Sequence, residues 1–93
     1  MNMKDDKGKI RMDLLPMECL EKMAEVLTFG AAKYKDNGWK SIKNARQRYR
    51  GALLRHMVSI EKGEKIDKES ELLHAAHLAT NAIFLLWFEL QNI

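Results

Sequence analysis

The chain has 93 residues, of which 46% are hydrophobic and 31% charged, and a net charge of +3. This balance is typical of one small globular domain and excludes a collagen-like or low-complexity chain. A single cysteine excludes a disulfide framework and a cysteine-rich zinc site, and a lone thiol fits a reducing cytoplasm. The most apolar run, residues 82–90, is too short to span a bilayer, so we expect no membrane role.

The N-terminal segment, residues 1–12, carries no hydrophobic period and is expected to be extended or mobile. It is charged and lacks an apolar stretch, so we do not expect it to be a signal peptide. Pro16 is typical of the first turn of a helix. From Met17 onward apolar residues recur every three or four positions, which predicts a first helix that reaches about Tyr34.

A loop is predicted for residues 35–43, because Asp-Asn-Gly at 36–38 is typical of a turn. Asn44 is a candidate N-cap for a second helix. This helix should reach about Lys62, since Gly63 is a natural stop. Its apolar face includes a histidine, His56.

Asp67 is a candidate N-cap for a third helix, about Lys68 to Gln91, which would be the longest of the three. Its second half is apolar almost all round, and a chain of this size cannot bury such a helix alone. We therefore predict that residues 1–93 form a single all-α domain of three helices. We also expect it to assemble into a helical-bundle homo-oligomer, a dimer or a tetramer.

A polar stripe runs along the predicted third helix. His74, His77 and Asn81 share one face, which continues into Phe84. Buried polar groups are costly unless they have partners. Either these groups satisfy one another and His56 as part of the structure, or they line a pocket that binds a divalent ion, a phosphate or a base. A nitrogen-rich site favours Mn²⁺ or Zn²⁺ over Mg²⁺.

Carboxylates gather between the second and third helices, and Glu61 and Asp67 flank the turn nearest His74. Taken singly, each acid is more simply an exposed charge or a helix cap. Together, oxygen ligands of this kind suit Mg²⁺ or Mn²⁺ bridging nucleotide phosphates. The predicted metal ligands are Glu61, Asp67, His74 and His77, and the predicted catalytic residues are Glu61, His56 and His77.

The middle of the chain is basic: from Lys33 to Arg55, eight basic residues accompany a single acid, Asp36. Arginine suits phosphate because its fork binds two oxygens at once. Exposed aromatic faces can stack on a nucleobase, or they can simply pack the loop. No phosphate-binding or dinucleotide-binding glycine motif is present. The predicted substrate-binding residues are Arg11, Lys33, Tyr34, Asn37, Trp39, Arg55 and Asn81.

Taken in order, these segments resemble a known family. Its motifs match Lys9–Pro16, Phe29–Trp39, Leu54–His56, Glu61–Asp67 and His74–Phe84. They resemble the phage and prophage dATP/dGTP diphosphohydrolase domain, a small relative of the all-α MazG-type nucleotide pyrophosphohydrolases. The resemblance implies a helical, oligomeric fold in the cytoplasm of a bacterial host cell. It also implies that Mg²⁺ or Mn²⁺ assists hydrolysis of a (deoxy)nucleoside triphosphate, most readily a purine dNTP, to monophosphate and pyrophosphate.

The chain departs from the wider MazG-type pattern, in which the ions sit on an ExxE motif and a later ExxD motif. Only Glu18 and Glu21 have the ExxE spacing, and they lie in the first helix. The alternative function is therefore a phage protein that sequesters a nucleotide, such as a cyclic nucleotide signal, without cleaving it. A third reading, nucleic-acid binding by the basic segment, leaves the His and Asn stripe unexplained, so nucleic acid is not an expected partner.

Overall fold

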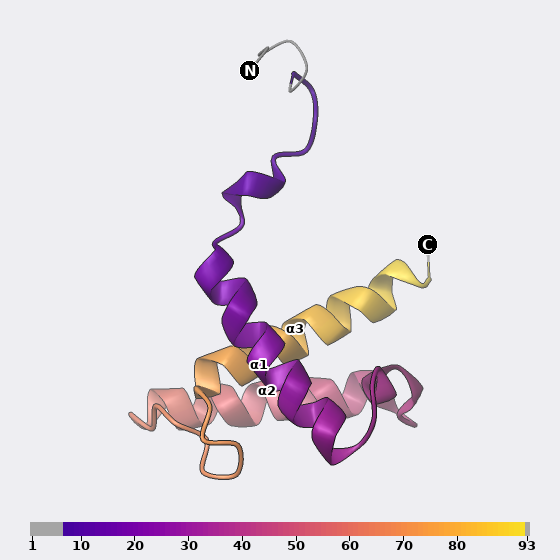
Figure 1. Ribbon diagram of the computed structural model, residues 1–93. Coiled ribbons are helices and arrows are strands. Elements are labelled where there is room, and N and C mark those ends of the chain that lie inside the picture. Colours follow the sequence, from indigo (N-terminus) through magenta and orange to yellow (C-terminus); the bar gives the residue numbers. More distant parts are fainter. Residues whose placement is uncertain (1–6, 93) are drawn as a thin grey trace.

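A computed structural model describes residues 7–92, and the regular elements in this range are helices (Figure 1). No residue in this range belongs to a strand, although an isolated antiparallel bridge joins Ile66 and Leu73. The predicted all-α class with three helices is confirmed. The elements are η2 (Met12–Leu14), α1 (Met17–Lys33), η3 (Gly38–Ser41), α2 (Ala45–Glu61) and α3 (His74–Leu90).

The bounds predicted for the first two helices are confirmed to within a residue. Helix α1 follows Pro16 and ends where the N–H of Tyr34 donates to the carbonyl of Gly30 at 2.9 Å. Helix α2 follows Asn44, but the side chain of this residue makes no capping hydrogen bond. The φ of Asn44 is 57°, in the left-handed region. Asparagine tolerates that conformation better than most residues, which explains its use at this turn.

Helix α3 corrects two predictions. It begins at His74 rather than near Lys68, and its 17 residues equal the lengths of α1 and α2, so the prediction of a long C-terminal helix is wrong. Asp67 caps a single turn instead, because its Oδ2 accepts the N–H of Ser70 at 2.9 Å. Glu71 then takes a φ of 63° and ends that turn. Local side-chain hydrogen bonds of this kind compete with helix formation.

Helices α2 and α3 form the main packing contact, α1 packs against α3, and η3 covers part of α2. Figure 1 shows α1 crossing the other two helices. The interior is partly polar, since His74, Thr80 and Asn81 are all buried. Among the described residues the buried hydrophobic side chains are those of Val26, Ala45 and Ala76. The space between the helices is therefore lined by both apolar and polar side chains, such as Phe29 and Asn81.

Large apolar side chains remain exposed on the outer faces of the helices, such as Met17 on α1 and Leu86 and Leu90 on α3. A single chain does not test the predicted homo-oligomer, which stays a prediction. Residues 7–16, which precede α1, extend away from the helices in Figure 1. Half of the segment predicted to be extended or mobile, residues 1–6, lies outside the described residues. Within residues 7–92, no helix has both the length and the apolar character needed to cross a membrane.

Candidate functional site

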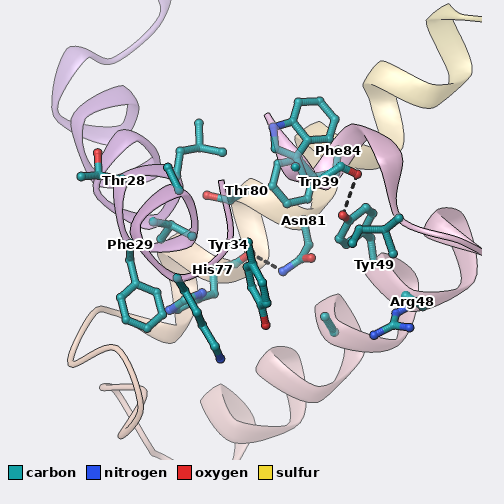
Figure 2. A pocket seen from close by; sticks show the side chains of 18 of the residues that line it. Thr28, Phe29, Tyr34, Trp39, Arg48, Tyr49, His77, Thr80, Asn81 and Phe84 are labelled. Carbon is teal, nitrogen blue, oxygen red and sulfur yellow. Dashed lines mark hydrogen bonds between the residues drawn. The ribbon is translucent and has the colours of Figure 1, made fainter. Parts of the chain in front are cut away.

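An open pocket of about 760 Å³ lies between the three helices. Figure 2 shows Tyr34 from the end of α1, Tyr49 from α2 and Asn81 from α3 around the same space. Small-molecule sites in proteins are typically clefts of about 300–1,000 Å³. The pocket is therefore large enough for a ligand of nucleotide size.

The structure brings most of the predicted site residues to this pocket. His74 does not line the pocket, but is buried beside it and touches His56. Glu61 is exposed at the last residue of α2, and Arg11 is exposed and paired with Asp13 at 2.7 Å. Neither of these two lies in the pocket wall. The predicted residues that do line it are Lys33, Tyr34, Asn37, Trp39, Arg55, His56, Asp67, His77 and Asn81.

Three imidazoles converge at one end of the pocket, and we call them, together with Asp67, the histidine cluster. The Nδ1 atoms of His56 and His74 lie 2.8 Å apart, and the rings of His56 and His77 stack with centroids 4.6 Å apart. Burial lowers the pKa of His56, and the two neighbouring imidazoles lower it further. Burial also lowers the pKa of His77, against the opposing effect of Asp67. Both shifts favour neutral rings, which have a lone pair available for a proton or a metal ion.

Asp67 is held in place by Ser70. Its Oδ2 accepts the backbone N–H of Ser70 at 2.9 Å and the hydroxyl at 2.8 Å. The Ser70 Oγ also lies 2.7 Å from Nε2 of His77, so the hydroxyl can donate to Asp67 while it accepts from His77. Burial raises the pKa of Asp67, but the hydrogen bonds from Ser70 outweigh it, and the net shift is downward. The carboxylate is therefore ionised and oriented. Sequence reasoning missed Ser70, although it lies three residues after Asp67, the spacing at which a capping side chain accepts a backbone N–H.

Trp39 belongs to a second group, which we call the aromatic cluster. Its ring stacks on Phe84 with centroids 4.4 Å apart, and it lies edge-on to Trp87 at 5.1 Å. The hydroxyl of Tyr49 donates to the carbonyl of Trp39 at 2.7 Å. These contacts favour a packing role for Trp39, whereas the side chain of Tyr34 remains exposed beside the pocket. The aromatic cluster consists of Trp39, Tyr49, Phe84, Trp87 and Phe88.

Cationic side chains border the pocket. Lys33 is paired with Glu69 at 3.0 Å. Arg48 and Arg55 line the pocket, and neither has an ion-pair partner within residues 7–92. Two guanidinium groups without carboxylate partners suit an anionic ligand. Sequence reasoning missed Arg48, although its position seven residues before Arg55 places both on one helix face.

The fold and the pocket define a small all-α domain with a histidine-lined site between its helices. The chain belongs to the family described as "dATP/dGTP diphosphohydrolase, N-terminal", whose model matches residues 1–93. This confirms the resemblance seen in the sequence motifs. The chain is also 36% identical, over 84 residues and 90% of its length, to a dATP/dGTP diphosphohydrolase of Salmonella phage PMBT28. It spans 28% of the length of that relative. No solved structure matches the chain.

Proposed function

We propose that this chain acts in a (deoxy)nucleoside triphosphate pyrophosphohydrolase, which converts a dNTP to dNMP and pyrophosphate. Purine substrates, dATP and dGTP, are the expected preference, because the family and the phage relative are named for them. One observation carries the proposal: a single pocket joins the histidine cluster to two arginines that have no ion pair within residues 7–92. Hydrolysis of a triphosphate needs both a group that accepts a proton and cations that stabilise the phosphates.

Different side chains of the pocket bind the phosphates, contact the base and accept a proton. Arg48 and Arg55 bind the phosphates and stabilise the leaving pyrophosphate. Tyr34 offers its exposed ring to the base. His77, whose pKa is lowered by burial, lines the pocket and accepts the proton of the attacking water. We assign no role to Glu61, since it lies outside the pocket wall.

A divalent ion, when bound, would neutralise charge that develops on the phosphates. Of the two ions predicted from the sequence, Mg²⁺ prefers oxygen ligands. At this end of the pocket, the carboxylate of Asp67 lies beside the imidazoles of the histidine cluster. This donor set fits Mn²⁺ better than Mg²⁺. The cytoplasmic location and the MazG-like assembly stay predictions.

One incubation, read in two ways, tests the proposal. Purified protein is mixed with each of the four dNTPs and Mn²⁺ or Mg²⁺, and the nucleotides are separated before and after the protein is denatured. We expect dNMP and pyrophosphate in molar excess over the protein, formed fastest from dATP and dGTP. Asp67→Asn should abolish this turnover, while the surface variant Glu18→Gln should keep it. Intact nucleotide that is recovered only on denaturation would reject the hydrolase in favour of a sequestering protein.

A further inference from the structure

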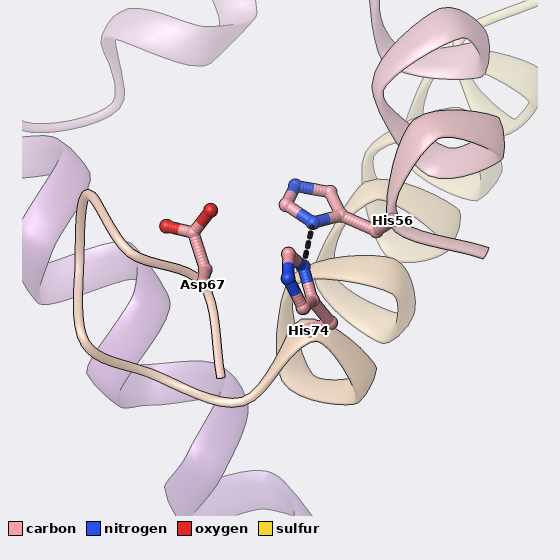
Figure 3. Close-up of side chains that lie close together, drawn as sticks. All are labelled: His56, Asp67 and His74. Carbon is pink, nitrogen blue, oxygen red and sulfur yellow. Dashed lines mark hydrogen bonds between the residues drawn. The ribbon is translucent and has the colours of Figure 1, made fainter. Parts of the chain in front are cut away.

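We propose that His56, Asp67 and His74 bind one ion of the transition-metal class, such as Mn²⁺, Fe²⁺, Co²⁺ or Zn²⁺, in preference to Mg²⁺. Each residue offers one ligand atom, and the three atoms lie within 4.8 Å of one another. Figure 3 shows the three side chains converging from α2, from the loop that follows it and from the start of α3. This inference rests on the proposed function only for what the ion does, because binding can be measured without a nucleotide.

The two imidazoles are already near a ligating geometry. Their Nδ1 atoms lie 2.8 Å apart, so that one ring must donate a proton to the other. Two nitrogens bound to a tetrahedral ion at 2.0–2.1 Å are about 3.3 Å apart, so the rings need to separate by only about 0.5 Å. An ion would replace the shared proton. A small shift of the loop that carries Asp67 and Ser70 would close the remaining gap.

Two of the three residues have polar neighbours of the kind that orient metal ligands, Glu64 beside His74 and Ser70 beside Asp67. A ligating histidine usually directs its other ring nitrogen to a carboxylate. Here Nε2 of His74 lies 3.9 Å from the carboxylate of Glu64. The Oδ2 atom of Asp67 is held by Ser70, and no residue within 7–92 donates a hydrogen bond to its Oδ1. One nitrogen of each imidazole and one carboxylate oxygen thus remain for an ion.

The site is closed on one side and open on the other. His74 is 6% exposed and forms the floor. His56 and Asp67 line the pocket, so coordination positions not filled by protein would face the space proposed for the nucleotide. Three protein ligands with an open position are typical of catalytic rather than structural metal sites. Two imidazoles and one carboxylate favour ions of the Mn²⁺ to Zn²⁺ series over Mg²⁺.

The test is a Co²⁺ titration of tag-free protein, first stripped with a chelator, in the absence of nucleotide. Visible absorption bands of protein-bound Co²⁺ should saturate at one ion per chain. Zn²⁺ should displace the Co²⁺, whereas the same concentration of Mg²⁺ should not. His56→Gln and Asp67→Asn should each weaken binding by more than about 100-fold, since removal of an outer partner alone costs about 10- to 100-fold. Glu61→Gln, which removes a metal ligand predicted from sequence that lies outside the pocket wall, should bind as the parent does.

Far-UV circular dichroism shows whether each variant is still folded, so that lost metal binding can be told apart from lost structure. His56 and Asp67 are only partly buried, so their variants should keep the helical spectrum, whereas the buried His74 is not used as the main test. Absence of Co²⁺ bands at millimolar metal would overturn the site, as would full binding by both folded variants or displacement by Mg²⁺. Metal binding without dNTP turnover would keep the site and reject the hydrolase. Turnover in Mg²⁺ that His56→Gln leaves unchanged would keep the hydrolase and reject the site.

Discussion

The two ends of the α2–α3 interface are built from different chemistry. At the start of α3, His74 and His77 meet His56 and the carboxylate of Asp67. Two to four turns further along the same helix, the aromatic rings of α3 surround Trp39. One helix therefore carries a reactive end and a packing end on a shared face.

The difference between the ends is one of energy as well as composition. Aromatic side chains stabilise a fold through the area they bury and through ring contacts. Buried polar groups contribute little net stability even when they are fully hydrogen-bonded. We therefore expect substitutions in the aromatic cluster to lower stability, and substitutions in the histidine cluster to lower ligand binding.

The largest expected effect is on stability, from Phe88→Ala. This ring packs against Trp87 and Tyr49 and does not line the pocket. Its loss should lower the free energy of unfolding by about 3 kcal/mol, the low end for a buried phenylalanine because the side chain is partly exposed. Urea denaturation followed by circular dichroism measures this. The exposed Leu86→Ala is the control and should cost less than about 1 kcal/mol. A loss of Co²⁺ affinity in folded Phe88→Ala would contradict the separation of the two ends.

The second effect is on nucleotide binding, from Arg55→Ala. A charge-assisted hydrogen bond contributes about 1.5–3 kcal/mol, so we expect dATP to bind roughly 30-fold more weakly. Arg50→Ala removes an equal charge from the same helix outside the pocket wall, and should change affinity by less than about threefold. Equilibrium dialysis measures both. Equal losses in the two variants would point to general charge attraction instead of a defined phosphate contact.

The sequence predicts the helices where their signals are local. In α1 the apolar period agrees with the proline at the start, and in α2 it agrees with the asparagine at the start and the glycine beyond the end. The start of α3 could not be predicted in this way. Asp67 is an equally good cap for a helix or for a single turn, and the hydroxyl of Ser70 with the positive φ of Glu71 decides for the turn.

The residues of the candidate site could also be predicted only where the signal is local in sequence. The spacing of His74, His77 and Asn81 is local, and it placed all three in or beside the pocket. The contact of His56 with His74 depends on how α2 packs against α3, which no periodicity specifies. Glu61 was chosen for its nearness in sequence to the turn, but the last residue of α2 is exposed to solvent.

A smaller effect is expected from Ser70→Ala, which removes the hydroxyl between Asp67 and His77. Asp67 and His77 are both still present in this variant. The carboxylate of Asp67, however, keeps only the hydrogen bond from the backbone N–H of residue 70 and loses the one from the hydroxyl. Affinity for Co²⁺ should fall about tenfold, as is usual when an outer partner of a ligand is lost. Ser41→Ala, at an exposed serine in η3, is the matched control. Unchanged affinity in Ser70→Ala would show that Asp67 does not need this support.

The smallest expected effect is on stability, from the removal of a single oxygen atom in the aromatic cluster. Tyr49→Phe keeps the ring that packs against Phe84 but removes the hydroxyl that donates to the carbonyl of Trp39. A part-buried acceptor left without its donor should cost about 1 kcal/mol of unfolding free energy. Tyr34→Phe makes the same chemical change at an exposed ring and should cost less than about 0.5 kcal/mol. Because the hydroxyl of Tyr49 holds the backbone of η3 and lies apart from the histidine cluster, Co²⁺ affinity should not change. A weaker Co²⁺ site in Tyr49→Phe would mean that the aromatic end positions the histidines as well as stabilising the fold.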